Sequence, residues 1–409
     1  MSLPLEGVRV LDMSRLLPGP FCSLLLADFG ADVLKIEDMG IGDYARWAPP
    51  FHEGVEGGAG AAIFVGLNRN KRSLRVNLKA PEGKEIFLKL VAGADVVLDS
   101  FRPGVLERLG VGYEQMRAAN PGIIHCAITG YGLDGPLRDR SGHDLNYLAR
   151  IGLLGLGGDD GAPLVQSAAQ IADIGGGGLM AAFGIMAALR ERERSGEGQV
   201  VDISMADGAL SWLTMLAANT LADGSVPRRG DLALGGGFLC YRPYPCADGH
   251  VALGALEPKF FQNFLAGVGR EELAEHQFEG PGTPAHAELE AIFAARTRAE
   301  WAAFAEQHDC CLEPVLALDE ALDSELVRER EMVVEIAQPG AAAPVRTLGN
   351  PVKLSRTPGD VHRLHAPQLG EHTQDALRDA GYGEEEIAAL LEQGVVGLPP
   401  EEQLGSFLT

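Results

Sequence analysis

The sequence has little cysteine and lacks the patterns that bind metals or direct secretion. Its six cysteines include no Cys-x-x-Cys pair and no cysteine–histidine set with zinc spacing, so we expect free thiols, a reducing compartment and no metal site. The first residues carry neither the basic region nor the long apolar stretch of a signal peptide. The most apolar segment, 179–189, runs into alternating arginine and glutamate and is predicted to be too short to span a bilayer. These absences predict a soluble, cytoplasmic protein.

Positive charge is also scarce. The 409 residues include 34 basic and 57 acidic side chains, and the net charge of −23 argues against a nucleic-acid or anionic-membrane partner. The segment 68–79 is an exception, because it places five cations in twelve residues. Two interpretations are open. The segment binds a phosphorylated nucleotide with a pantetheine arm, its adenine near Val76, or it is a solvated strand edge whose lysines discourage aggregation.

The N-terminal half predicts a doubly wound α/β domain. A buried strand at 8–13, an apolar helix at 21–29 and a strand at 31–37 form a βαβ unit, which predicts a parallel sheet covered on both faces. The turn at 14–20 lacks Gly-x-Gly-x-x-Gly, so a dinucleotide-dependent dehydrogenase loses its main support. Ligands are expected at the carboxyl ends of the strands. The pattern continues with a helix at 81–91, a strand at 95–98, a helix at 113–120 and a strand at 122–129.

A second region follows a loop at 228–231, in agreement with the two domains that this chain length predicts. It begins with two strands, 239–245 and 250–256, that are typical of a hairpin because Ala-Asp-Gly joins them. From about residue 331 the chain returns to strands. Further helices are expected at 257–268, 285–295, 298–308, 374–380 and 384–393.

Three acid/base residues lie beside glycine or proline. They are His143 in Ser-Gly-His-Asp, Asp173 before the glycine run 175–178, and Glu257 in Ala-Leu-Glu-Pro. An imidazole and carboxylates that converge on one carbon atom are what proton transfer on two faces of an acidic C–H requires. The alternative is structural, with Asp144 and Asp173 capping helices and Glu257 opening one. The three residues taken together favour catalysis.

Five separated blocks agree with a known family at consistent spacing. They are 5–12 (Leu-Glu-Gly-Val-Arg-Val-Leu-Asp), 27–37, 68–79, 129–132 (Thr-Gly-Tyr-Gly) and 196–202. Through them the sequence resembles the family III coenzyme A transferase superfamily over nearly its whole length, and within it the α-methylacyl-CoA racemases. The resemblance implies an α/β fold with a doubly wound parallel sheet in a large domain and a smaller α+β domain. The large domain would comprise 1–224 and the returning segment 331–409, and the small domain 225–330.

The resemblance also implies an acyl-CoA substrate, with no separate cofactor because CoA is part of the substrate. Two ring-like subunits would interlock as a homodimer, and each active site would lie between the large domain of one subunit and the small domain of its partner. Relatives often carry an arginine after Lys-Ile-Glu, where this chain has Asp38, so Arg72 or Arg75 is expected to compensate. The positions that match CoA contacts are Val76, Asn77, Leu78, Lys79, Ser100, Phe101, Arg102, Arg108, Gly142, Asp144, Leu145, Asn146 and Tyr147.

The resemblance further implies the reaction. Transferases of this family use an aspartate at the position of Asp173 as a nucleophile, whereas racemases keep it as a base. Racemases add a histidine thirty residues earlier, which matches His143, and a glutamate before proline, which matches Glu257. We therefore expect racemisation of 2-methylacyl-CoA through an enolate that N–H groups near Asp144 stabilise, with the Asp144 side chain capping the helix that starts there. CoA transfer through Asp173 and a non-catalytic CoA-binding subunit are the alternatives.

Overall fold

The chain folds into two compact units, and the computed structural model describes residues 2–400 and 405. The larger unit comprises the chain up to Leu148, Ala169–Ser211 and the chain from Glu325 onward, and the smaller unit comprises Ala149–Ala168 and Trp212–Ser324. The helix α9 (Thr214–Asp223), which the sequence assigned to the first domain, belongs to the smaller unit. Residues of α8 (Met205–Ser211) are buried in the larger unit, whereas no residue of α9 is buried.

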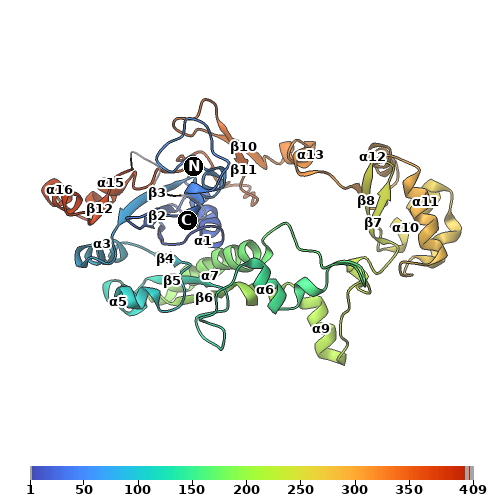
Figure 1. The fold of residues 1–409 in the computed structure, drawn as a ribbon, viewed down its shortest axis with the longest axis horizontal. Helices are drawn as coiled ribbons and strands as arrows, with labels where there is room; N and C mark the ends of the chain where they lie inside the picture. The colour runs from blue at the N-terminus through green and yellow to red at the C-terminus, as the bar shows by residue number, and fades with distance from the viewer. Residues whose placement is uncertain (1, 401–404, 406–409) are drawn as a thin grey trace. The chain divides into compact units, whose positions relative to one another are not determined.

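A seven-stranded sheet organises the described part of the larger unit, in the order β12-β3-β2-β1-β4-β5-β6. Its strands are β1 (Arg9–Asp12), β2 (Asp32–Glu37), β3 (Lys71–Val76), β4 (Val96–Asp99), β5 (Ile124–Thr129), β6 (Val200–Ser204) and β12 (Val396–Gly397). The pairings are parallel except that of β12 with β3. The mixed α/β architecture with a large parallel sheet is therefore confirmed (Figure 1).

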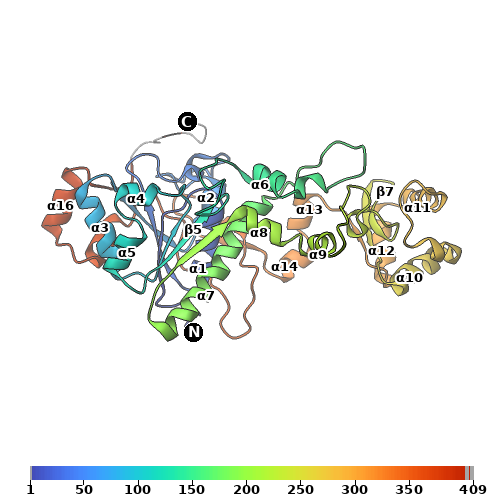
Figure 2. The ribbon, with the colours of Figure 1, turned by 90° about the horizontal axis from the view of Figure 1, so that it is seen from below.

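Helices cover both faces of this sheet. One face packs against α3 (Pro81–Ala92), α5 (Tyr113–Ala119), α15 (Thr373–Asp379) and α16 (Glu384–Glu392). Alternate strand residues such as Leu11, Leu34 and Val97 point into this core, as the two-residue period of a strand requires. On the other face, α1 (Pro18–Asp28) packs against β1 and β2, and α7 (Met180–Ser195) against β5 and β6 (Figure 2).

The first helix begins earlier than predicted, at Pro18 instead of residue 21. Proline suits the first helical position, where the missing N–H has no partner to lose. At the next position, a Cβ on Gly19 would lie 2.1 Å from the Cβ of Ser14, so only glycine allows the turn to pass this close to the helix. The apolar pattern alone did not reveal this start.

The remaining elements of the larger unit are shorter. They are α2 (Ala62–Asn68), α4 (Val105–Leu109), α6 (Asp144–Arg150), which extends into the smaller unit, α14 (Glu325–Glu329) and the antiparallel pair β10 (Val333–Ile336) and β11 (Val345–Leu348).

The smaller unit contains the predicted hairpin. Strands β7 (Tyr241–Cys246), β8 (Gly249–Gly254) and β9 (Leu312–Pro314) form an antiparallel sheet, with helices α10 (Pro258–Val268), α11 (Pro284–Ala294), α12 (Arg298–Gln307) and α13 (Leu318–Leu322). Buried aromatic rings dominate its core. The rings of Phe264 and Phe293 are stacked with centroids 5.0 Å apart, and Trp301 packs against both. Such pairs contribute about 0.5–1.5 kcal/mol beyond the area they bury, which stabilises a small core.

One helix among the described residues, Ile171–Ser195, is long and apolar enough to cross a membrane. The prediction that this apolar segment is too short is therefore wrong, because a π-helical segment, Ile171–Leu179, continues directly into α7. The glycine run 175–178 within it is buried. Its contacts with α1 and α8 are those of a helix packed inside the larger unit.

Candidate active site

The glycine run after Asp173 fixes where the helix of this aspartate lies. A Cβ on Gly176 would stand 2.6 Å from the carbonyl oxygen of Met205, and one on Gly178 would stand 2.6 Å from that of Pro18. Only glycine lets α8 and α1 approach this closely. The main chain of two other helices therefore holds the glycine run, which follows Asp173 in the same helix.

Asp144 caps this same helix. Its Oδ1 accepts hydrogen bonds from the main-chain N–H groups of Ala172 (2.6 Å) and Asp173 (3.0 Å). The prediction that Asp144 caps the helix starting at its own position is wrong, because the carboxylate instead reaches Ala172, 28 residues later in the chain, in a helix that begins at Ile171. Asp173 lies inside the first turn and does not cap, since Gln170 occupies the N-cap position.

Burial and neighbouring charges shift the pKa of Asp173. The pKa of its carboxyl group is raised from 3.8 to about 6, mainly by burial and also by the negative charge of Asp144, while the charge of His143 opposes the shift. A carboxyl group with this pKa accepts and releases a proton close to neutral pH. His143 is exposed, and its main-chain N–H donates to Asn146 Oδ1 (3.0 Å), which fixes the chain at the start of α6.

Tyr147 joins α6 to the sheet. Its hydroxyl donates to the carbonyl oxygen of Gly142 (2.6 Å), and its ring meets that of Tyr131 edge-on, with centroids 5.2 Å apart. The pKa of Tyr147 is raised to about 12, mainly by burial and also by the charge of Asp173, while the charge of Arg102 opposes the shift. The hydroxyl therefore stays protonated. The structure thus brings Arg102 and Tyr147 into one electrostatic environment with the aspartate.

Glu257 belongs to the smaller unit, whereas His143 and Asp173 belong to the larger one. As predicted, it opens a helix: it is the N-cap residue of α10, and its carbonyl oxygen accepts from the N–H of Phe260 (3.0 Å). Its side chain is exposed and makes no capping hydrogen bond. Its catalytic role stays a prediction.

Most residues predicted to contact CoA follow the carboxyl ends of β3 and β4. Asn77, Leu78 and Lys79 come directly after β3, which ends at the buried Val76, and Lys79 is exposed. After β4, Asp99 Oδ1 accepts from the N–H of Phe101 (2.9 Å), which shapes the turn of Ser100 and Arg102. Arg108 is exposed on α4, and Leu145 and Asn146 are exposed on α6. Asp99 also contacts the buried His125, whose Nε2 lies 2.6 Å from Asp99 Oδ2.

The basic cluster 68–79 is not a free anion-binding surface. Arg69 is buried and bidentate to Asp28, and the buried Lys71 pairs with Asp12 (3.5 Å). The segment is not a solvated strand edge either, because β12 pairs with β3 on its outer side. Both interpretations, the anion-binding segment and the strand edge, therefore need correction.

Arg72 also has internal partners. Its guanidinium pairs with Asp32 (2.7 Å) and Asp379 (3.0 Å). Asp32 is the first residue of β2, so Arg72 points to the amino end of the sheet, away from the end where CoA is expected. The expectation that Arg72 compensates for Asp38 is therefore wrong. The register of β3 against β2 places the Arg72 side chain beside Asp32, at the opposite end of the sheet from Asp38.

Comparison with known proteins identifies the family. Residues 5–373 match the sequence profile of CoA-transferase family III. The chain belongs to this family. A protein of Mus musculus named alpha-methylacyl-CoA racemase is 36% identical over 96% of this chain and 97% of its own length. A Mus musculus succinyl-CoA:glutarate CoA-transferase is 32% identical over 96% of this chain and 90% of its own length. A solved CAIB/BAIF family protein from Brucella suis has a TM-score of 0.80 and 30% identity, and covers 93% of this chain and 100% of that one.

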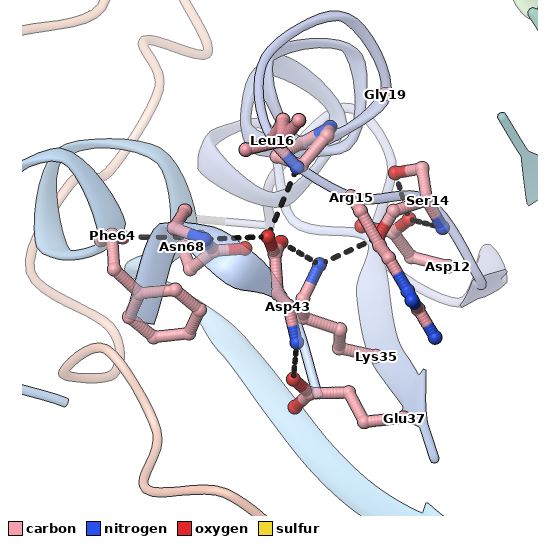
Figure 3. A network of polar contacts seen from close by, with 12 residues as sticks. Asp12, Ser14, Arg15, Leu16, Gly19, Lys35, Glu37, Asp43, Phe64 and Asn68 are labelled. Carbon is pink, nitrogen blue, oxygen red and sulfur yellow. Dashed lines mark hydrogen bonds and ion pairs between the residues drawn. The ribbon is translucent and has the colours of Figure 1, made fainter. Parts of the chain in front are cut away.

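In this member of CoA-transferase family III, sequence reasoning missed a buried charge network beside the turn that follows β1 (Figure 3). Lys35 Nζ donates to the carbonyl oxygen of Ser14 (2.8 Å) and pairs with Asp43 Oδ2 (2.9 Å), and both charged side chains are fully buried. Asp43 Oδ1 accepts from the N–H of Leu16 (3.0 Å), which adopts a left-handed φ of 62°. The sequence contained a signal for this network. Asp12 and Lys35 are charged residues within apolar segments that are predicted to be buried strands, and buried charges require partners.

Proposed function

We propose that the protein is a racemase that interconverts (R)- and (S)-2-methylacyl-CoA thioesters. The observation that carries the proposal is that His143 and Asp144, at the start of α6, lie close to Asp173, in the first turn of the helix from Ile171, and that the charges of the first two act on the third. A carboxyl group with a pKa of about 6 suits proton exchange, because the best acid–base catalyst titrates near the working pH. The similarity to the mouse racemase over 96% of the chain supports the same reaction.

In the proposed reaction one residue removes the α-proton and another returns a proton to the opposite face. The electron pair of the broken C–H bond moves into the thioester carbonyl and forms an enolate. Asp173 serves one face and His143 the other, and they exchange the roles of base and acid with the direction of turnover. Each proton transfer contributes about 10²–10⁴-fold to the rate. Main-chain N–H groups at the start of α6 donate to the enolate oxygen.

The proposal includes the surroundings of the site. Glu257 acts beside His143, contributed by the smaller unit of the partner in a homodimer. CoA is part of the substrate, so the reaction needs no further cofactor, and the enzyme works in the cytoplasm. Co-refolding of a His143→Ala variant with a Glu257→Ala variant tests the shared site: mixed dimers regain part of the activity that each variant lacks. A fully active monomer in sedimentation contradicts the dimer.

CoA transfer between carboxylic acids is the second candidate, because similarity to the succinyl-CoA:glutarate CoA-transferase covers the same share of the chain. In that reaction the Asp173 carboxylate attacks the thioester carbonyl and CoA thiolate leaves, which gives a mixed anhydride. The thiolate then attacks the aspartyl carbonyl and releases the first acid, and the acceptor carboxylate takes CoA through a second anhydride.

Two measurements on the same preparation separate the candidates. Incubation with a panel of acyl-CoA thioesters in deuterated water is expected to place deuterium at the α-carbon of 2-methylacyl-CoA without any second acid. Hydroxylamine added with acyl-CoA is expected to trap nothing on the protein. A hydroxamate on Asp173, combined with no α-exchange, would establish the transferase instead.

A further inference from the structure

Arg15 and Asp38 form an ion pair where the sequence departs from its family. Arg15 lies in the turn after β1, and Asp38 directly follows β2, at the position where the family resemblance leads us to expect an arginine. Arg15 Nη2 donates to Asp38 Oδ2. Both residues follow parallel strands that are neighbours in the sheet, so the pair lies at the edge where α/β sheets bind their ligands.

Aromatic side chains hold the guanidinium of Arg15 in a defined plane. Its central carbon lies 5.2 Å from the ring centroid of Tyr44 and 5.8 Å from that of Phe101. Arg15 Nη1 also donates to the Tyr44 hydroxyl (3.0 Å), and its main-chain N–H donates to Ser100 Oγ (3.2 Å). Ser100 and Phe101 are themselves residues predicted to contact CoA, so Arg15 extends that predicted surface.

The main chain around Arg15 is fixed from the protein interior. Lys35 bonds the carbonyl oxygen of Ser14 on one side, and Asp43 bonds the N–H of Leu16 on the other. In Figure 3 the Arg15 side chain points away from Lys35 and Asp43. The buried network therefore orients Arg15 outward without using its charge.

Two other arginines of the larger unit are committed to contacts within the protein. Arg72 has two carboxylate partners at the far end of the sheet. Arg75 donates to the carbonyl oxygens of Met39 and Leu398. Arg15 has one carboxylate partner, and its side chain remains 24% exposed. A guanidinium has five N–H donors in a planar fork, so the contacts to Asp38 and Tyr44 leave donors for a second anion.

We propose that Arg15, oriented by Asp38, binds a phosphate group of the coenzyme A moiety and replaces the arginine that relatives carry at position 38. The inference rests on the proposed acyl-CoA substrate and adds the residue that anchors it. Asp38 does not repel the phosphate as an isolated carboxylate would, because its charge is neutralised by Arg15.

Calorimetric titration with free coenzyme A tests the proposal on the 409-residue protein. Arg15→Gln is expected to weaken binding about 10-fold or more, equivalent to about 1.4 kcal/mol. Arg190→Gln, the matched control on an exposed arginine of α7 with 74% of its side chain accessible, is expected to bind within about twofold of the wild type. The double variant Arg15→Gln/Asp38→Arg returns the cation to position 38 and is expected to recover most of the loss.

Binding by Arg15→Gln within twofold of the wild type overturns the proposal, and so does a double variant that binds no better than Arg15→Gln. Thermal melts show whether each variant is folded. If Arg15→Gln does not fold, Arg15→Lys replaces it, and a loss of about 3-fold or more is expected because an ammonium group is a point charge without the planar fork. A wild-type enzyme that does not bind coenzyme A refutes the proposed function, which is a different result.

Discussion

The carboxylate of Asp144 accepts a hydrogen bond from the main-chain N–H of Asp173, 3.0 Å away. The same oxygen accepts the N–H of Ala172, so one side chain satisfies two donors at the start of the helix. Its negative charge also raises the pKa of the Asp173 carboxyl group. Asp144 is therefore both a cap for the helix and a regulator of the acid that the helix presents.

Replacing Asp144 with Asn is expected to lower the pKa of Asp173, because the substitution removes one of the charges that raise it and keeps an oxygen that can cap the helix. The limb of the pH–rate profile that reports Asp173 moves to lower pH. The measurement is α-deuterium exchange of 2-methylacyl-CoA as a function of pH. Asp139→Asn, whose side chain is 81% exposed, is the control and leaves the profile in place. An unmoved limb in Asp144→Asn would contradict the coupling.

Asp173→Asn is expected to make the protein more stable above pH 6. The folded-state pKa of about 6 lies above the ordinary 3.8, so the folded protein binds more protons between these values and loses stability as the pH rises through them. The cost at pH 7 is at most about 3 kcal/mol, and the amide removes it. Urea unfolding of both proteins at pH 4 and pH 7.5 checks this: the gain at pH 7.5 should shrink at pH 4. Equal gains at both pH values would refute the raised pKa.

Substitution of each proposed base is expected to abolish racemisation of both enantiomers, because one turnover uses both residues. His143→Ala and Asp173→Asn should each retain slow α-proton exchange on one enantiomer, the one whose proton faces the remaining base. Deuterium incorporation into the separate enantiomers measures this, with a thermal melt of each variant as the control for folding. Racemisation that survives in His143→Ala would exclude the assignment. CoA transfer that survives in His143→Ala but not in Asp173→Asn would favour the transferase.

Two arginines predicted to bind phosphate are expected to behave differently. Arg108→Ala removes an exposed cation of α4 and should weaken coenzyme A binding in a salt-dependent manner. Arg72→Ala breaks the pairs with Asp32 and Asp379 and should leave binding within about twofold while lowering stability by about 1 kcal/mol. Titrations at two salt concentrations and urea unfolding give both quantities. A larger binding loss in Arg72→Ala than in Arg108→Ala would reverse this assignment.

The buried network is expected to matter for stability. Asp43→Ala leaves the fully buried Lys35 ammonium without its carboxylate and should cost about 3–5 kcal/mol in the free energy of unfolding. Glu193→Ala, which removes one partner of an exposed ion pair on α7, is the matched control and should cost less than about 1 kcal/mol. Urea denaturation of the two variants measures the difference. Equal losses would mean that Asp43 contributes no more than a surface charge.

Features that depend on local pattern were predictable from the sequence. The βαβ unit of β1, α1 and β2 was predicted from apolar segments separated by glycine and proline. The hairpin of β7 and β8 was predicted from two strand-like segments joined by Ala-Asp-Gly. The resemblance implies that His143 and Asp173 act in one site; the charge of His143 lowers the pKa of the Asp173 carboxyl group, and the catalytic roles of both residues stay predictions.

Features that depend on distant partners were not predictable. The carboxylate of Asp144 reaches a helix 28 residues away, and no local pattern distinguishes that helix from its own. Arg72 points to the amino end of the sheet because of the strand register, whereas the sequence shows only that a cation is present. Arg15 was overlooked because its partners are separated in the sequence: Asp38 directly follows β2, Tyr44 begins a short 3-10 helix, and Phe101 lies in the turn after β4.

The antiparallel pairing of β12 with β3 has a consequence for synthesis on the ribosome. Arg75 of β3 bonds to Leu398, which is 323 residues later in the chain. At ordinary elongation rates about 320 residues take roughly 15–60 s, and during this time the strand that will cover β3 does not yet exist. The helices α15 and α16, which close one face of the sheet, arrive equally late. A nascent chain of this protein therefore carries an open strand edge and an uncovered apolar face through most of translation, and both are surfaces that a chaperone recognises.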